Sequence, residues 1–199
     1  MTMTTMRSFF VAAVLGIAAA LPATAHDTVW TTTLSGPAEA PPNASPGFGS
    51  VTITIDFDLV TMHVQASFAD LVGTTSASHI HCCTAVPGTG TIGVATVTPT
   101  FTDFPLGVTS GSYDHVFDMT LASSYNPSFV TAQGGISQAF NALVAGLNNG
   151  SAYYNIHSSV YSGGEIRGFL QVAAVPEPES YALLLAGLGV MALAKRRRR

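Results

Sequence analysis

Three histidines in the middle of the chain have the residue type and the spacing of a metal site. His79 and His81 are two residues apart, so on a strand both rings point to one face, with about 7 Å between their Cα atoms. His157 follows on a later predicted strand. Neutral imidazoles with an open coordination position suit copper or zinc, which makes the three residues candidate ligands. The rings could instead hydrogen-bond buried backbone and fix the sheet register, and the sequence leaves both interpretations open.

Two adjacent cysteines, Cys82 and Cys83, directly follow the paired histidines. A thiolate there would favour Cu(I) or zinc. Neighbouring side chains on a strand point opposite ways, so at most one sulfur should face the site, and Cys82 is the candidate. The alternatives are a buried thiol and a disulfide between two chains. We do not expect the two to bond to each other, because the small ring would strain the peptide between them.

Arg167 is the only basic residue between His26 and Val175, a stretch that contains nine acidic residues. Its planar guanidinium suits a bidentate pair with a carboxylate, which predicts a structural clamp; attraction of an anion to a metal site is the alternative. Glu165 lies two residues before it and should share its face of a strand. A stretch this acidic would repel a phosphate backbone, so nucleic-acid binding is excluded as a function.

The middle of the chain predicts the elements that must position these residues. It is poor in charge and rich in Thr, Ser, Gly, Val and aromatic residues, a composition typical of β-sheets with many turns. Alternation of apolar and polar residues predicts strands at Val29–Leu34, Ser50–Asp56, Met62–Ala69, Ile92–Val97, Tyr113–Met119, Ala152–His157 and Glu165–Val172. Helical spacing from Ile136 to Leu147 predicts one short helix. We therefore expect an antiparallel β-sandwich or barrel with one helix at its end.

Both ends of the chain have the features of targeting segments. Residues 1–25 combine a basic start, a short apolar run and an Ala-Thr-Ala cleavage site, which predicts a secretory signal peptide removed by signal peptidase. The C-terminus carries Pro176, Glu177 and Pro178, then an apolar run over 181–194 and a basic cluster over 195–199. Such a run should stop in the membrane with the basic cluster on the cytoplasmic side.

These C-terminal features resemble a PEP-CTERM sorting signal. The resemblance implies recognition and cleavage by an exosortase in a Gram-negative bacterium, so the membrane would hold the protein only transiently. A permanent tail anchor is the alternative. The chain then divides into a signal peptide (1–25), a body (26–174) and a sorting signal (175–199).

The body resembles the CHRD (chordin-type) domain over about residues 29–171. The resemblance rests on Leu34–Pro42 as an opening motif, Ala77–His81 as a central motif, and Ala152–His157 with Gly163–Gly168 as a closing motif. Because the central and closing motifs occur together in the family, the resemblance implies that His157 approaches the paired histidines. The paired histidines, the later histidine and Arg167 also resemble, distantly, the copper site of Cu/Zn superoxide dismutase, another β-sandwich. The next histidine after the pair is His115, so no bridging and zinc-binding cluster follows and dismutase activity is not predicted.

Two functions remain open for an exported protein of this kind. One is a non-enzymatic surface or extracellular-matrix module that binds exopolysaccharide, surface proteins or its own copies. The other is an extracytoplasmic copper- or zinc-binding protein, with redox activity as an option. We find no nucleophile elbow, phosphate-binding loop or catalytic carboxylate pair, which favours the first function; the paired histidines favour the second.

Overall fold

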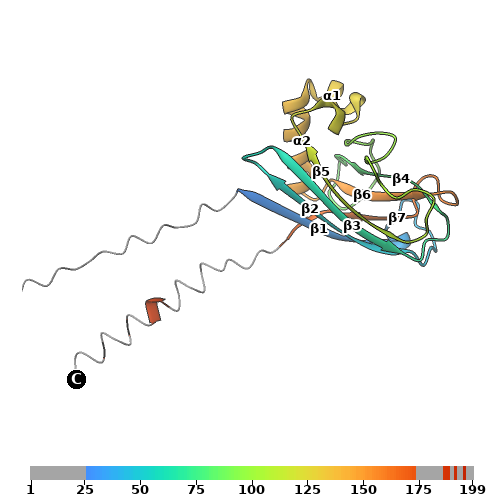
Figure 1. Ribbon diagram of the computed structural model, residues 1–199, viewed down its shortest axis with the longest axis horizontal. Helices are drawn as coiled ribbons and strands as arrows, with labels where there is room; N and C mark the ends of the chain where they lie inside the picture. Colours follow the sequence, from blue (N-terminus) through green and yellow to red (C-terminus); the bar gives the residue numbers. More distant parts are fainter. Residues whose placement is uncertain (1–25, 174–185, 189–190, 192–194, 196–199) are drawn as a thin grey trace, which may run out of the picture.

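The computed structural model describes residues 26–173, 186–188, 191 and 195, and the fold lies in the first of these ranges. It is one antiparallel sheet that curls into a half-barrel (Figure 1), so the predicted mostly β fold is confirmed. The strands along the chain are β1 (Asp27–Ser35), β2 (Phe48–Asp56), β3 (Thr61–Ala69), β4 (Thr75–His81), β5 (Gly111–Asp118), β6 (Tyr153–Ser158), β7 (Ile166–Phe169) and β8 (Gln171–Val172). Their order across the sheet is β4-β6-β7-β1-β2-β3-β5, and β8 pairs with β1.

The hydrophobic core fills the inner side of the curled sheet because apolar residues alternate along its strands. On β2, Val51, Ile53 and Ile55 are fully buried, while the residues between them face outward. Burying each such side chain contributes about 1.5–3 kcal/mol to folding. Aromatic rings extend this core, with Phe101 stacked between Tyr113 and Tyr154 at centroid distances of 5.9 and 5.8 Å.

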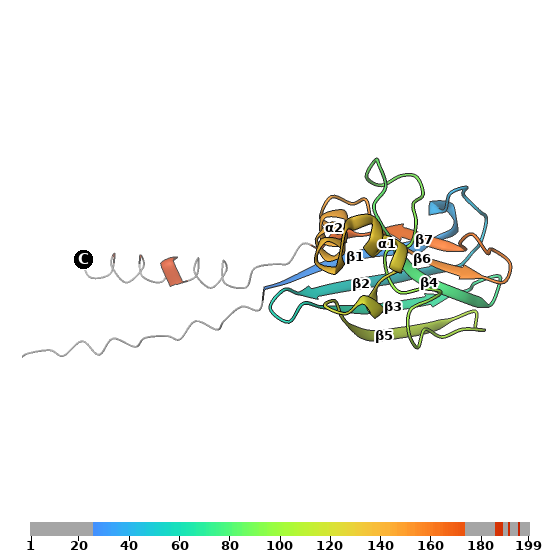
Figure 2. The same ribbon diagram turned by 90° about the horizontal axis from the view of Figure 1, so that it is seen from above.

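Two helices, α1 (Pro127–Gln133) and α2 (Ile136–Asn148), lie together at one end of the sheet (Figures 1 and 2). The predicted helix is α2, which buries Leu143 and Leu147 in the core. The short helix α1 was not predicted, because only Phe129 is buried along it and seven residues give little helical periodicity. Its start is fixed by the Asn126 side chain, which accepts a hydrogen bond from the Ser128 N–H at 3.0 Å.

Two predicted strands need correction. Residues 92–97 form no strand and make only isolated bridges at Val94 and Thr96. The Thr96 hydroxyl accepts the Ile80 N–H at 2.9 Å, so a side chain takes the place of a backbone carbonyl and the ladder stops. The predicted strand 165–172 is divided into β7 and β8, which pair with β1 at separate places.

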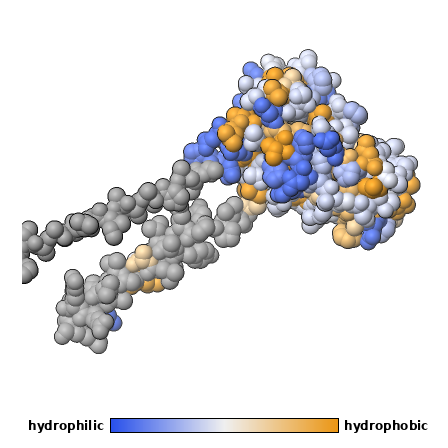
Figure 3. Space-filling model, viewed as in Figure 1, coloured by the Kyte–Doolittle hydropathy of each residue, from blue (hydrophilic) through white to orange (hydrophobic). Residues whose placement is uncertain are grey.

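The two ends of the described body lie side by side, because Val172 pairs with Trp30 and the Ala173 N–H donates to the Val29 carbonyl at 2.8 Å. The predicted signal peptide and nearly all of the predicted sorting signal lie outside the described residues. Within the described ranges, no helix has the length and apolar character needed to cross a membrane. On the face of the body seen in Figure 3, hydrophobic residues form separate patches among pale and hydrophilic ones.

Candidate metal centre

The three candidate ligands project from the outer side of strands β4 and β6. Pairing brings Ala77 opposite His157, His79 opposite Asn155, and His81 opposite Tyr153. On β7, Arg167 pairs with Asn155 and joins the same side. The residues between them on these strands face the core and are fully buried, namely Ile80, Tyr154, Ile156 and Ile166. The two-residue periodicity of the strands therefore places one polar group on the side opposite the core.

The structure brings the three histidine rings together. One ligand atom from each of His79, His81 and His157 lies within 4.8 Å of the others. The Nε2 atoms of His79 and His157 are 2.9 Å apart, and the ring centroids of His79 and His81 are 4.8 Å apart. The separation is small enough for one ion to reach all three rings after modest rotations.

Backbone carbonyls fix which nitrogen of two rings carries the proton. Nδ1 of His81 lies 2.7 Å from the Ile92 carbonyl oxygen, and Nδ1 of His157 lies 2.8 Å from that of Ser162. A carbonyl oxygen only accepts, so each Nδ1 donates and each Nε2 keeps its lone pair. Metal-binding histidines are usually oriented by the same second hydrogen bond. Within the part of the chain that the structure describes, Nε2 of His81 is buried and has no hydrogen-bond partner. Nδ1 of His79 is buried as well, and a contact with the Pro99 backbone raises the pKa of this ring slightly against the effect of burial.

The rings are neutral at physiological pH because burial disfavours their charged forms. Burial, helped by the neighbouring His81 and His157, lowers the pKa of His79 from 6.5 to about 3. Burial likewise lowers the pKa of His81 to about 4 and lowers that of His157 below its ordinary value. Neutral imidazole is the form that binds a metal ion. Because Nε2 of His157 keeps its lone pair, Nε2 of His79 donates the proton between the two rings, and this proton would move to Nδ1 of His79 when Nε2 binds an ion.

Comparison with known families identifies the body of the protein. The family model of the CHRD domain matches residues 30–170. The chain belongs to the CHRD domain family. The model of the PEP-CTERM protein-sorting motif matches residues 174–199, which indicates an exported protein of the cell envelope or surface. No curated protein and no solved structure matches the chain, so these comparisons add nothing to the distant resemblance to superoxide dismutase.

The motifs that carry the CHRD resemblance meet at this site. The opening motif contributes Glu39, which the sequence analysis did not single out. It is buried, its Oε1 accepts a hydrogen bond from Asn155 Nδ2 at 2.7 Å, and its Oε2 lies 3.8 Å from Arg167 Nε. Burial raises the pKa of Glu39 to about 7, although the charge of Arg167 opposes the shift. Membership of a motif was the only sequence signal for Glu39 and Asn155.

Arg167 joins the polar side of the CHRD domain to two loops, and its ion pair with a carboxylate is a single contact with Glu39 at 3.8 Å in place of the predicted bidentate one. Its Nε donates to the Ala38 carbonyl at 2.6 Å and its Nη1 to the Gly90 carbonyl at 3.0 Å. Two backbone oxygens take the places predicted for a carboxylate. The guanidinium also lies 4.9 Å from the centroid of the Tyr153 ring, which stacks on His81 at 4.6 Å. Arg167 therefore packs behind one candidate ligand.

Glu165 does not pair with Arg167. Its carboxylate accepts hydrogen bonds from the Ser45 hydroxyl at 2.6 Å, from the Gly73 N–H at 3.1 Å and from the Val72 N–H. Burial alone would raise the pKa of Glu165, but these hydrogen bonds, with one from Ser158, hold it below its ordinary value. Glu165 thus ties the 45–47 and 72–73 segments to the start of β7.

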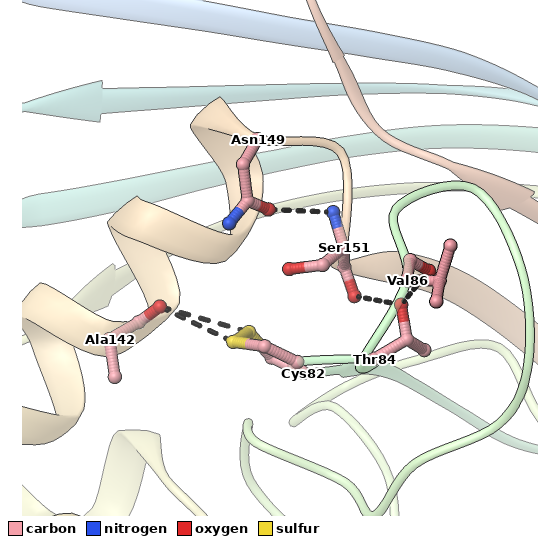
Figure 4. Close-up of a disulfide and its surroundings, with 7 residues drawn as sticks. Cys82, Thr84, Val86, Ala142, Asn149 and Ser151 are labelled. Atoms are coloured by element: carbon pink, nitrogen blue, oxygen red, sulfur yellow. Dashed lines mark hydrogen bonds between the residues drawn. A yellow bond between two sulfur atoms is a disulfide. The ribbon is translucent and has the colours of Figure 1, made fainter.

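The expectation that the two cysteines would not bond to each other is also wrong. Cys82 and Cys83 form a disulfide, so neither offers a thiolate to a metal (Figure 4). The chain leaves β4 after His81, and the alternation of a strand no longer separates the two side chains. Both sulfurs point to α2, where the Ala142 carbonyl oxygen lies 3.8 Å from Sγ of Cys82 and 3.4 Å from Sγ of Cys83.

Proposed function

We propose that this CHRD domain holds one copper or zinc ion between His79, His81 and His157. The observation that carries the proposal is the buried Nε2 of His81. The bond at Nδ1 leaves the lone pair on Nε2, and no described residue gives this nitrogen a hydrogen-bond partner. A polar atom left unpaired in this way costs about 1–3 kcal/mol. An ion at the centre of the cluster would remove that cost, because it gives the lone pair a partner.

The donor set favours copper or zinc over other ions. All three donors are imidazole nitrogens, which both metals accept, and the disulfide removes the thiolates that would select Cu(I). Bonds of about 2.0–2.1 Å place the ligand nitrogens of a tetrahedral ion roughly 3.3 Å apart. The ion would therefore draw His81 inward and separate His79 from His157 slightly, since their Nε2 atoms are now 2.9 Å apart.

The competing interpretation is that the histidines only stabilise the sheet. The carbonyls of Ile92 and Ser162 do hold His81 and His157, as a structural role requires. That role explains one nitrogen of each ring. It leaves Nε2 of His81 unexplained, and the two interpretations make opposite predictions about metal uptake.

The test is metal uptake by the exported protein compared with two histidine variants. Wild-type protein should retain about one copper or zinc ion at pH 7, measured by elemental analysis, and should melt at a higher temperature when metal is present at a hundredfold excess over Kd, which corresponds to about 2.7 kcal/mol. His157→Ala should lose both effects. His63→Ala is the matched control. His63 points outward from β3, where it bonds the exposed carboxylate of Asp114 at 2.7 Å. Absence of retained metal and of stabilisation in wild-type protein would return the histidines to a structural role.

Export and surface location complete the proposal. The PEP-CTERM motif supports processing by an exosortase, and the N-terminal pattern supports prior removal of residues 1–25 by signal peptidase. The protein would then act outside the inner membrane as a non-enzymatic metal-holding module that can meet exopolysaccharide or surface proteins. The intact mass of the same exported sample shows whether the signal peptide and the segment after the Pro-Glu-Pro sequence have been removed.

A further inference from the structure

The Cys82–Cys83 disulfide lies at the base of a loop that returns to the histidine cluster. We call residues 84–93 the covering loop. It leaves β4 at the disulfide and comes back beside it, where the Cys82 N–H donates to the Gly93 carbonyl at 3.2 Å. Near its start, the Thr84 N–H donates to the Ser151 carbonyl at 3.0 Å. The disulfide thus lies between the end of β4, which carries His81, and the two ends of the covering loop.

The covering loop supplies the groups that orient His81 and hold Arg167. The Ile92 carbonyl accepts from Nδ1 of His81 at 2.7 Å, and the Gly90 carbonyl accepts from Arg167 at 3.0 Å. The hydroxyl of Tyr153, the residue that stacks on His81, lies 3.4 Å from the Ile92 carbonyl oxygen. A shift of the covering loop would therefore release the proton on Nδ1 of His81 from its fixed position.

The disulfide packs closely against α2 (Figure 4). Gly146 faces the two sulfurs, and even a Cβ at this position would overlap Sγ of both cysteines. Reduction would replace one covalent bond with two thiols that each need van der Waals space, so the base of the covering loop or α2 has to move. Both cysteines also line a cavity of about 430 Å³. Cys82 is buried and Cys83 is half-buried, so Cys83 is the sulfur that a small thiol would attack from this cavity.

We propose that Cys82–Cys83 is a redox-sensitive site whose reduction weakens metal binding by the neighbouring histidines. A small thiol attacks one sulfur to give a mixed disulfide, and a second thiol completes the exchange. The protein gains two electrons and two protons as two thiols, and the reductant leaves as its own disulfide. The metal-binding part of this inference rests on the proposed function; the coupling between the disulfide and His81 does not.

The first test is zinc affinity in the oxidised and reduced states of the intact protein. Zinc is used because Cu(II) would oxidise the thiols again. Protein reduced with a phosphine, freed of reductant without oxygen and checked by a mass gain of about 2 Da should bind zinc roughly 10- to 100-fold more weakly, as expected when a ligand loses its second hydrogen bond. The double variant Cys82→Ser with Cys83→Ser should bind as weakly and should not respond to the phosphine. An unchanged or tighter Kd after confirmed reduction overturns the proposal.

The second test reads the position of the His81 proton without any metal. Nitrogen NMR of the zinc-free oxidised protein should show His81 protonated at Nδ1, and reduction should give a mixture of both tautomers. His157 is the internal control, because its Nδ1 bonds Ser162 outside the covering loop and should stay protonated. If oxidised protein binds no zinc but the His81 signal responds to reduction, the proposed function fails while the coupling stands. A His81 signal that ignores reduction rejects the coupling.

Discussion

The outer side of the sheet has an exposed part and a covered part, and they differ in what lies over them. Across β1, β2, β3 and β5, this side carries exposed hydroxyls and amides, for example Ser67 and Gln65. Across β4, β6 and β7 it carries the histidine cluster and Arg167. The two parts are continuous, because Ser35 on β1 pairs with Arg167 on β7. The exposed part is open to solvent, whereas the covering loop, the segment at Ala38 and the turn at Ser162 contact the covered part.

Two histidines at equivalent outward positions on their strands differ in chemistry because loops cover only one of them. His63 and His79 both occupy outward positions on strands. His63 bonds a solvent-exposed carboxylate, Asp114, while His79 lies under the loops with its nearest partner another histidine, His157. Burial keeps the His79 ring neutral, and it leaves nitrogens without partners. Both residues are histidines, so the burial of His79, and not its residue type, makes it the candidate metal ligand.

The largest expected effect comes from breaking the covered part at Arg167. Arg167→Met keeps a long side chain but leaves Glu39 without its positive partner and the carbonyls of Ala38 and Gly90 without their donor. Removing one partner from a buried charged pair costs about 3–5 kcal/mol, measured as the loss in free energy of unfolding by urea. Arg167→Lys keeps the charge but cannot span both carbonyls, so it should cost less, about 1–3 kcal/mol. A Met variant as stable as the parent would mean that the loops, and not Arg167, hold this part together.

The comparison also shows what could be predicted from the sequence. Alternation found most strands, and the spacing of His79 and His81 placed both on one face, because these are local consequences of backbone geometry. The alternation pattern could not identify Glu39 or the Ile92 carbonyl, because both reach the site from loops, whose residues follow no regular alternation. The convergence of His157 was expected only from a family resemblance, since pairing of β4 with β6 joins segments about 75 residues apart. The disulfide was missed because the strain expected in its small ring was taken to exclude a bond between adjacent cysteines.

An intermediate effect is expected when the pH is lowered in metal-free protein. His79 and His81 have folded-state pKa values of about 3 and 4 against an ordinary 6.5, so the unfolded chain takes up their protons first and stability falls as the pH drops below 6.5. Each contributes a slope of at most about 1.4 kcal/mol per pH unit. Glu39 acts oppositely: its pKa rises from 4.5 to about 7 on folding, so its contribution is present at low pH and lost as the pH rises through 7.

Glu39→Gln separates the two contributions. The amide keeps an oxygen for Asn155 but cannot titrate, so the variant should lose stability more steeply than the parent between pH 7 and pH 4.5. Urea unfolding at half-unit pH steps, with a chelator present, measures both slopes. If the plots of unfolding free energy against pH are parallel for parent and variant, Glu39 is ionised throughout this range. Water would then reach the covered part more than its packing indicates.

The smallest expected effects come from one substitution made on each part of the outer side. Ser45 is buried in the loop before β2, where its hydroxyl donates to Glu165 at 2.6 Å and accepts the Gly47 N–H at 3.0 Å. Ser67 is exposed, and its hydroxyl lies 3.0 Å from that of Ser50. Both changes to Ala remove one hydroxyl.

Ser45→Ala removes a buried hydrogen bond to a carboxylate and should cost about 1.5–3 kcal/mol. Ser67→Ala leaves groups to which water can hydrogen-bond, so it should change stability by less than about 0.5 kcal/mol. Urea unfolding at pH 7 compares the two directly. Equal losses would show that water reaches the covered part, in which case burial could not keep the histidine rings neutral and ready to bind an ion.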